Sequence, residues 1–243
     1  MTVRRLFAPT LPDGGGAVTL GDGPSRHVRV LRMRVGDEVV LFDGLGRAAK
    51  ATISSLGDVV ACEADVPTEV TSERARVVLL LAIPKGATLD DCVRMATELG
   101  VDEVALVRTE RSVPRWDEAR ARSRVERLTR IACEASAQCE RDDVPIIHEP
   151  QSLDAWIGRF PSSATGVVFG ARAAGRLDLA CTPEQVWCAV GPEGGFTPGE
   201  LESFEAAGFA LASLGRWVLR VDTAVAAALT TVRDRLDASL QAR

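Results

Sequence analysis

The hydrophobic pattern divides the chain into two parts. Residues 1–71 hold short apolar runs bounded by Gly, Asp or Pro, and most of this segment lacks helix-length periodicity. Such runs predict short strands that form a small β-barrel. The polar stretch 67–76 indicates a linker, and beyond it apolar runs of strand length alternate with amphipathic helices. We therefore expect a barrel over 1–71 and an α/β domain over 72–243.

The second part of the pattern predicts a mostly parallel sheet with helices on both faces. Residues 77–83, VVLLLAI, are apolar throughout, as in a strand that is buried on both sides. A helix is expected to begin at Thr88, which has a capping-box spacing to Asp91, and to end at Gly100. The other expected elements are strands at 103–107, 166–170, 186–190 and 210–214, and helices at about 117–140, 198–207 and 222–239.

Composition narrows the class of protein. The chain has 243 residues, of which 46% are hydrophobic and 26% charged. No apolar run approaches the roughly 20 residues of a membrane span, and the N-terminus has no apolar signal core, so we expect a cytoplasmic protein that binds no membrane. The six cysteines form no C-x-x-C pair and there are only two histidines, so we expect neither disulfides nor a metal site.

Arginines cluster in the first part of the chain although the net charge is −5. Residues 26–39, RHVRVLRMRVGDEV, place Arg26, Arg29, Arg32 and Arg34 around apolar side chains. A solvated basic face of an amphipathic turn explains this pattern. A patch that contacts RNA phosphates explains it as well.

The loop GPEGGF, residues 191–196, combines three glycines with a central glutamate. It matches neither common nucleotide fingerprint, and Glu193 would repel a phosphate. Thr197, Pro198 and Glu200 form a strong helix start, so the loop joins the carboxyl end of a strand to a helix, where open α/β sheets bind ligands. Backbone donors and acceptors beside a carboxylate suit a flat, cationic ligand such as S-adenosylmethionine. A purely structural tight turn is the alternative.

A second glycine bend occurs in LGRWVLRVDTAVAAAL, residues 214–229, which passes from a strand end through Gly215 into an Ala-rich helix. Arg220 and Asp222 lie there among residues that otherwise suit burial. Charges at such a junction are exposed, paired or functional. One interpretation makes Asp222 the N-cap and Arg220 its ion-pair partner.

These motifs carry a resemblance. The pair GPEGGFTPGE and LGRWVLRVDTA resembles the signature of the SPOUT methyltransferases. Over nearly its whole length the chain is similar to the branch of that superfamily that makes N3-methyluridine in 16S ribosomal RNA. RHVRVLRMRVGDEVVLFDGLG resembles the PUA-like RNA-binding barrel of that branch. Its middle motifs are matched in order by KGATLDDCVRMATELGV, ERSV and EASAQCERDDVP.

The resemblance implies a PUA-like barrel over 1–71 and a SPOUT methyltransferase domain with a C-terminal trefoil knot over 72–243. It further implies a homodimer that forms through the knotted domain, and the small ribosomal subunit as substrate. S-adenosylmethionine would lie in the knot. The residues implied to hold it are Phe169, Gly170, Gly191, Pro192, Glu193, Gly194, Leu214, Gly215, Leu219 and Ala224.

Methylation at N3 requires that the N3 proton leaves the uridine. We assign Arg220 as the cation that stabilises the uridinate and Asp222 as the base or orienting group. Because N3 lies on the Watson–Crick edge, the target must be unpaired or turned out of its helix. The predicted RNA contacts are Arg4, Arg5, Arg29, Arg32, Arg111 and Arg141.

The chain departs from the usual family pattern at several positions, and QCER at 138–141 replaces the more common Q-S-G-R. The family usually has Lys, Pro, Arg, Thr and Glu where this chain has Met95, Leu106, Trp217, Val221 and Asp222. Two other functions stay open. One is a SPOUT methyltransferase with another RNA target, such as a ribose 2′-hydroxyl or a transfer RNA. The other is a non-catalytic RNA-binding factor in ribosome assembly.

Overall fold

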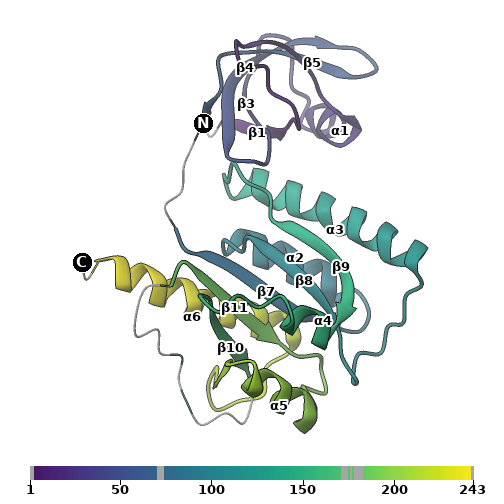
Figure 1. Ribbon diagram of the computed structural model, residues 1–243. Coiled ribbons are helices and arrows are strands. Elements are labelled where there is room, and N and C mark those ends of the chain that lie inside the picture. The colour runs from purple at the N-terminus through teal and green to yellow at the C-terminus, as the bar shows by residue number, and fades with distance from the viewer. Residues whose placement is uncertain (1–2, 70–73, 171–174, 176, 178–182, 242–243) are drawn as a thin grey trace. The chain divides into compact units, whose positions relative to one another are not determined.

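Figure 1 shows a computed structural model of the chain, which describes residues 3–69, 74–170, 175, 177 and 183–241. The chain divides into two compact units. The first contains Met1–Glu73 and Cys133–Val144, and the second contains Arg74–Ala132 and Pro145–Arg243. The boundary that we expect between residues 71 and 72 lies outside the described residues.

The first unit is built on a sheet with the strand order β1-β3-β4-β5-β2, and β6 pairs with β4. Strand β1 runs parallel to β3, and the other pairs are antiparallel. A β-bulge between Ile53 and Ser55 interrupts the pairing of β4 with β5. The elements are β1 Arg4–Phe7, β2 Gly16–Thr19, α1 Asp22–Val30, β3 Glu38–Phe42, β4 Arg47–Leu56, β5 Val60–Ala64 and β6 Thr68–Glu69.

Period-2 alternation places the core of this unit on one face of its strands. Ala49, Ala51 and Ile53 of β4 are buried, and Val28 of α1 packs in the same cluster. The arginine-rich segment therefore begins as a helix that turns Val28 inward. Its residues Arg26 and Arg29 are exposed.

Residues Cys133–Val144 join the first unit through a glycine turn. The backbone N–H of Val144 donates to the carbonyl of Gly44 at 2.9 Å. Gly44 has a φ of +80°, and a Cβ there would lie 2.9 Å from Phe7 and 3.1 Å from Val144. Only glycine fits this position, since any side chain would separate the two segments.

The second unit contains a parallel sheet with the strand order β12-β10-β11-β7-β8-β9. Its strands are β7 Arg76–Ala82, β8 Glu103–Arg108, β9 Ile146–Ser152, β10 Thr165–Phe169, β11 Gln185–Val190 and β12 Ala210–Ala212. The helices are α2 Thr88–Glu98, α3 Glu118–Gln138, whose last turns belong to the first unit, α4 Leu153–Ile157, α5 Pro198–Ala206 and α6 Val221–Gln241. The predicted α/β fold with a parallel sheet is confirmed.

Helices cover both faces of this sheet. On one face, Val78 and Leu80 of β7 belong to a cluster with Trp156 of α4 and Phe204 of α5. Side chains alternate along a strand, so Leu79 points to the opposite face, where α2 and α6 pack together and α6 contacts β11. The fully apolar run of β7 follows from this burial on two sides.

Three details differ from the expected elements. Strand β9 and helix α4 have no counterpart in the prediction, because β9 is only partly buried and carries His148 and Glu149 within its span. The capping box at Thr88 is wrong. The N-cap is Ala87 and no side chain caps the helix, so Thr88 lies inside the first turn.

Candidate functional site

A cavity of about 580 Å³ lies at the carboxyl ends of the neighbouring strands β10, β11 and β12. The loop after β11 and the segment after β12 form most of its wall. All ten residues implied to hold the cofactor line it, namely Phe169, Gly170, Gly191, Pro192, Glu193, Gly194, Leu214, Gly215, Leu219 and Ala224. Arg111, Trp217 and Val218 line it as well.

The loop after β11 is a compact turn that depends on glycine. The backbone N–H of Gly195 donates to the carbonyl of Pro192 at 2.8 Å, and Gly195 has a φ of +68°. A Cβ at Gly191 would lie 3.2 Å from both the Cα of Gly195 and the N of Phe196. A side chain at Gly191 would therefore make tight contacts with the backbone of the turn, which would have to shift to accept it.

Glu193 connects this loop to a distant one. Its Oε1 accepts a hydrogen bond from the backbone N–H of Lys85 at 2.9 Å. Lys85 follows β7 and precedes α2, so the carboxylate joins the loops after two adjacent strands. The glutamate at the centre of the glycine-rich loop thus positions the wall of the cavity.

Arg111 and Glu200 hold the other side of the loop. Nη1 of Arg111 donates to the carbonyl of Gly194 at 2.6 Å and to that of Phe196 at 3.4 Å. Glu200 is buried, and its Oε1 accepts from the backbone N–H of Glu110 at 2.9 Å. The contact with Glu110 has no signal in the sequence, since 90 residues separate the partners.

The predicted capping box at the start of α5 is confirmed. Thr197 is the N-cap, and its Oγ1 accepts from the backbone N–H of Glu200 at 3.3 Å. In return, Oε2 of Glu200 accepts from the N–H of Thr197 at 2.8 Å. Glu200 therefore satisfies two backbone donors, one in its own helix and one in the turn after β8.

The second bend lies at Gly215, whose φ is +130°. Oγ of Ser213 accepts from the N–H of Gly215 at 3.1 Å and donates to its carbonyl at 3.0 Å. A Cβ at Gly215 or at Gly170 would meet no protein atom within 4 Å, so both lining positions leave open space. The two bends that the sequence singled out thus face a shared cavity.

Arg220 and Asp222 flank the lining residues Leu219, Val221 and Ala224 without lining the cavity themselves. Helix α6 begins at Val221, which places Asp222 in its first turn and excludes it as the N-cap. Its Oδ1 accepts from the N–H of Thr223 at 2.8 Å. Arg220 is exposed, and among the described residues no ion pair joins it to Asp222.

Negative charges at the site affect the pKa of the buried thiol of Cys92, which lies on α2. Burial raises the pKa of Cys92 to about 12, and the negative charges of Asp222, Asp91 and Glu193 add to that rise. Asp222 and Glu193 therefore act on the same residue of α2. The catalytic candidate Asp222 and the loop residue Glu193 lie on the side of the unit that α2 occupies.

The predicted RNA contacts of the first unit differ in accessibility. Arg4, Arg29 and Arg32 are exposed, and Arg32 has a φ of +54°. Arg29 donates to the carbonyls of Gly57, at 2.9 Å, and Asp58. Arg4 and Arg32 are open to an external anion, whereas Nη2 of Arg29 is already engaged by these two carbonyls.

Arg5 and Arg141 are held within the first unit instead. Arg5 forms an ion pair with Asp142, and its guanidinium lies 5.7 Å from the ring centre of Phe42. Arg141 pairs with Asp143 through Nη2 at 2.6 Å and Nε at 3.1 Å. Arg111, the remaining predicted contact, belongs to the second unit and to the cavity.

Metal sites, membrane-spanning helices and disulfides are absent from the described part of the chain. It contains no group of three His, Cys, Asp or Glu side chains that could hold a metal ion. None of its helices combines the length and the apolar character needed to cross a membrane. Five cysteines are free thiols there, whereas Cys181 lies outside the described residues.

Comparison with known proteins identifies the family. Residues 71–233 match the model of the RNA methyltransferase domain, and residues 20–58 match that of the RNA methyltransferase PUA domain. Over 98% of its length the chain is 31% identical to the ribosomal RNA small subunit methyltransferase E of Mycobacterium bovis, of which it covers 95%. The chain belongs to the ribosomal RNA small subunit methyltransferase E family.

Solved structures agree with this membership. A ribosomal RNA small subunit methyltransferase E from Neisseria gonorrhoeae, bound to S-adenosylmethionine, is 29% identical and has a TM-score of 0.88, covering 96% of this chain and 98% of that one. A methyltransferase from Legionella pneumophila in complex with S-adenosylmethionine is 27% identical with a TM-score of 0.89 and the same coverage. In this member of the methyltransferase E family, the cavity is lined by the loop after β11, with Gly191, and by the segment after β12, with Gly215.

Proposed function

We propose that the protein transfers a methyl group from S-adenosylmethionine to N3 of a specific uridine in the 16S ribosomal RNA of the small subunit. The observation that carries this proposal is the shared cavity of the two glycine bends, at Gly191 and Gly215. The relative from Neisseria gonorrhoeae, similar over 96% of this chain, was solved with S-adenosylmethionine bound.

The residues of the cavity fit this cofactor. Phe169, Leu214 and Leu219 supply apolar surface for a flat ring, and the glycines expose backbone donors and acceptors. The missing side chains of Gly170 and Gly215 leave space for a ligand. When bound, S-adenosylmethionine supplies a methyl group on a positively charged sulfur.

We assign the polar roles to the start of α6. Arg220 is exposed beside the cavity wall and would stabilise the negative charge that develops on uridine when N3 loses its proton. Asp222 would accept or orient that proton. Because methyl transfer depends on alignment, the chief contribution of the chain is to hold the uridine at the mouth of the cavity.

RNA binding is the role proposed for the barrel, with domain boundaries at 1–71 and 72–243. Support comes from the PUA-domain match over residues 20–58, which includes Arg29 and Arg32. These two arginines and Arg4 would contact phosphates directly. Arg5 and Arg141 would contribute to the same RNA-binding surface, with their side chains held in place by ion pairs to Asp142 and Asp143.

A cytoplasmic homodimer with a trefoil knot completes the proposal. Helix α6 presents small residues, and Ala226 and Ala227 are only half-buried in the single chain, which suits close packing against a second copy. Light scattering on the purified protein tests the dimer. A monomer at all concentrations would contradict it.

The central test follows labelled methyl groups from S-adenosylmethionine into assembled small subunits and into naked 16S RNA that lack the modification. The proposal expects N3-methyluridine on digestion of the RNA. Arg220→Ala and Asp222→Asn should each slow the transfer while RNA stays bound.

Other results of this test would support the alternatives. A methylated ribose, or methylation of transfer RNA alone, would show a different RNA target. Failure to bind S-adenosylmethionine in calorimetry, with RNA binding intact, would indicate a non-catalytic assembly factor.

A further inference from the structure

Trp217 is a large aromatic side chain that the fold leaves in solvent. It is 73% exposed, and it lines the cavity between the bend at Gly215 and the start of α6. Its neighbour Val218 is 81% exposed and lines the same cavity. Large apolar side chains that stay in solvent beside a ligand cavity mark a surface that something else covers.

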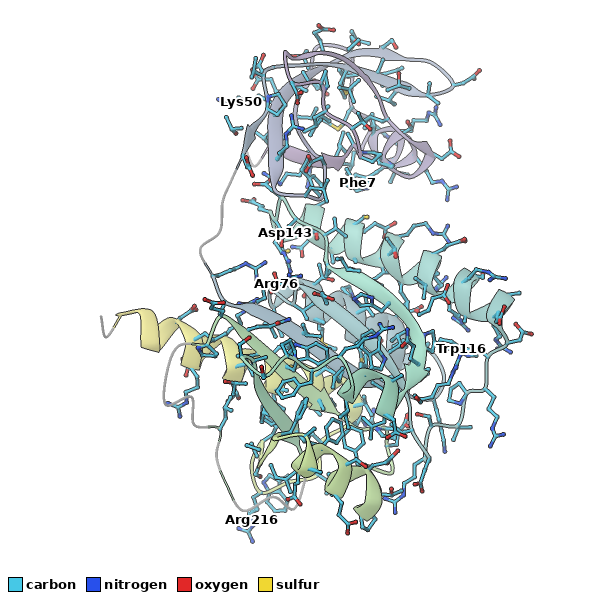
Figure 2. All side chains as sticks on the ribbon, viewed as in Figure 1. Phe7, Lys50, Arg76, Trp116, Asp143 and Arg216 are labelled. Carbon is cyan, nitrogen blue, oxygen red and sulfur yellow. The ribbon has the colours of Figure 1, made fainter. Side chains whose placement is uncertain are left out.

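One face of the Trp217 ring already carries a cation. The guanidinium carbon of Arg216 lies 5.1 Å from the centre of the ring, as in a cation–π pair. Figure 2 shows the Arg216 side chain at the outer edge of the second unit. Because Arg216 covers one face and the residue is still largely exposed, the opposite face of the ring is open.

The charges around this ring favour a negatively charged partner. Arg216 and Arg220 are both exposed within four residues of each other, and Arg111 lines the cavity. The nearby carboxylates Glu193 and Asp222 keep their negative charges but are outnumbered by these three arginines, and each already accepts a backbone hydrogen bond, from Lys85 and from Thr223. An aromatic face beside exposed arginines is the combination that binds single-stranded nucleic acid, with bases on the ring and phosphates on the cations.

We propose that Trp217 is the stacking surface for the target uracil, with Arg216 contacting an adjacent phosphate. This inference rests on the proposed function and names the residue that holds its substrate. A base that is turned out of the RNA helix loses stacking on its neighbours, and an aromatic side chain restores it. Stacking uses the ring face, so the Watson–Crick edge, which includes N3, stays free to meet the cavity.

The test compares Trp217→Leu with Trp217→Phe. Leucine keeps an apolar side chain without a π face, whereas phenylalanine keeps the face. We expect Trp217→Leu to raise the KM for small subunits about tenfold. Trp217→Phe should stay within about threefold of the wild type, since a smaller ring still stacks. The Kd for S-adenosylmethionine, measured by calorimetry, should change much less than the KM in Trp217→Leu, because Trp217 lies at the exposed rim of the cavity.

Three outcomes would overturn the inference while the proposed function stands. The first is wild-type methylation with an unchanged KM in Trp217→Leu. The second is a matching rise in the Kd for S-adenosylmethionine, which would place the cofactor on the ring. The third is dissociation of Trp217→Leu into monomers, which would assign Trp217 to a subunit interface. If the wild type forms no N3-methyluridine on any RNA, the proposed function itself fails.

Discussion

The side-chain carboxylate of Glu193 accepts a hydrogen bond from the backbone N–H of Lys85, with 2.9 Å between Oε1 and N. The two residues are 108 positions apart in the chain, yet they follow the adjacent parallel strands β11 and β7. This bond explains an acidic residue in a loop that is otherwise made of glycine, proline and one phenylalanine.

Replacing Glu193 with alanine should weaken cofactor binding. The loop would lose its hydrogen bond to Lys85. Ordering of the loop on cofactor binding would then offset part of the favourable binding free energy. We expect a rise of about tenfold in the Kd for S-adenosylmethionine by calorimetry. The control is Lys85→Ala, which keeps the backbone donor and should leave the Kd within about twofold. Equal losses in both variants would show that the side chain of Lys85 matters instead.

Replacing Glu200 with alanine should destabilise the second unit. Two backbone N–H groups, those of Thr197 and Glu110, would lose their acceptor, one of them a helix cap. The free energy of unfolding should fall by about 3 kcal/mol in urea. Glu202→Ala changes an exposed side chain of the same helix and should have no effect. A stable Glu200→Ala variant would mean that water replaces both bonds.

The hydrogen bond between Glu103 and His148 should make the free energy of unfolding depend on pH in the acidic range. Oε2 of Glu103 lies 2.6 Å from Nε2 of His148. That hydrogen bond, followed by the charges of His148 and Arg76, lowers the pKa of Glu103 below its usual 4.5, although burial opposes the shift. Since the pKa is lower in the folded state, ionised Glu103 contributes stability above pH 4.5 that is lost as the pH falls through the lower folded value.

Glu103→Gln tests this dependence. The variant should be less stable than the wild type by about 1 kcal/mol at neutral pH, and the difference should shrink in acid, where the wild-type carboxylate is protonated as well. Urea unfolding over a series of pH values measures it. Glu149→Gln alters an exposed carboxylate on β9 and should match the wild type throughout. If the stability difference between Glu103→Gln and the wild type were the same at every pH, the loss of stability would come from changed packing and not from the charge of Glu103.

Two buried thiols should resist alkylation in the native protein. Burial raises the pKa of both Cys92 and Cys188 to about 12, and neither has measurable exposure. At about pH 8 iodoacetamide should leave them unmodified until the chain unfolds. Peptide mapping by mass spectrometry locates the label. Rapid native labelling of Cys92 would show that the packing of α2 against α6 opens.

Loss of Arg4 or Arg32 should weaken RNA binding in a salt-dependent way. When an exposed arginine contacts a phosphate, counterions are released from the RNA. Arg4→Gln or Arg32→Gln should therefore reduce the slope of log K for RNA binding against log salt concentration by about one. Filter binding at several salt concentrations measures the slope. Arg122→Gln on α3, an exposed arginine outside the predicted set, is the control. An unchanged slope would remove that arginine from the interface.

Features that depend on neighbours along the chain were predictable from the order of its residues. Apolar periodicity located β7, β8, α3 and α6, because burial of one face imposes a repeat on consecutive residues. Thr197 and Glu200 marked the start of α5, since a capping box is a local contact. The motifs around Gly191 and Gly215, together with those at 26–46, 85–101, 110–113 and 134–145, indicated the family by resemblance. Apart from that resemblance, each signal is read from residues within a single element or loop.

Features that depend on the order of the strands became visible only in the folded chain. The sheet places β10 between β11 and β12, which brings the bends at Gly191 and Gly215 to one cavity. The partners of Glu193 and Glu200, and the exposure of Trp217, follow from the same arrangement. Strand β9 escaped prediction because it owes its form to pairing with β8 rather than to a strong pattern of its own. Hydrogen bonds between residues far apart leave no periodicity in a sequence, so the fold alone reveals them.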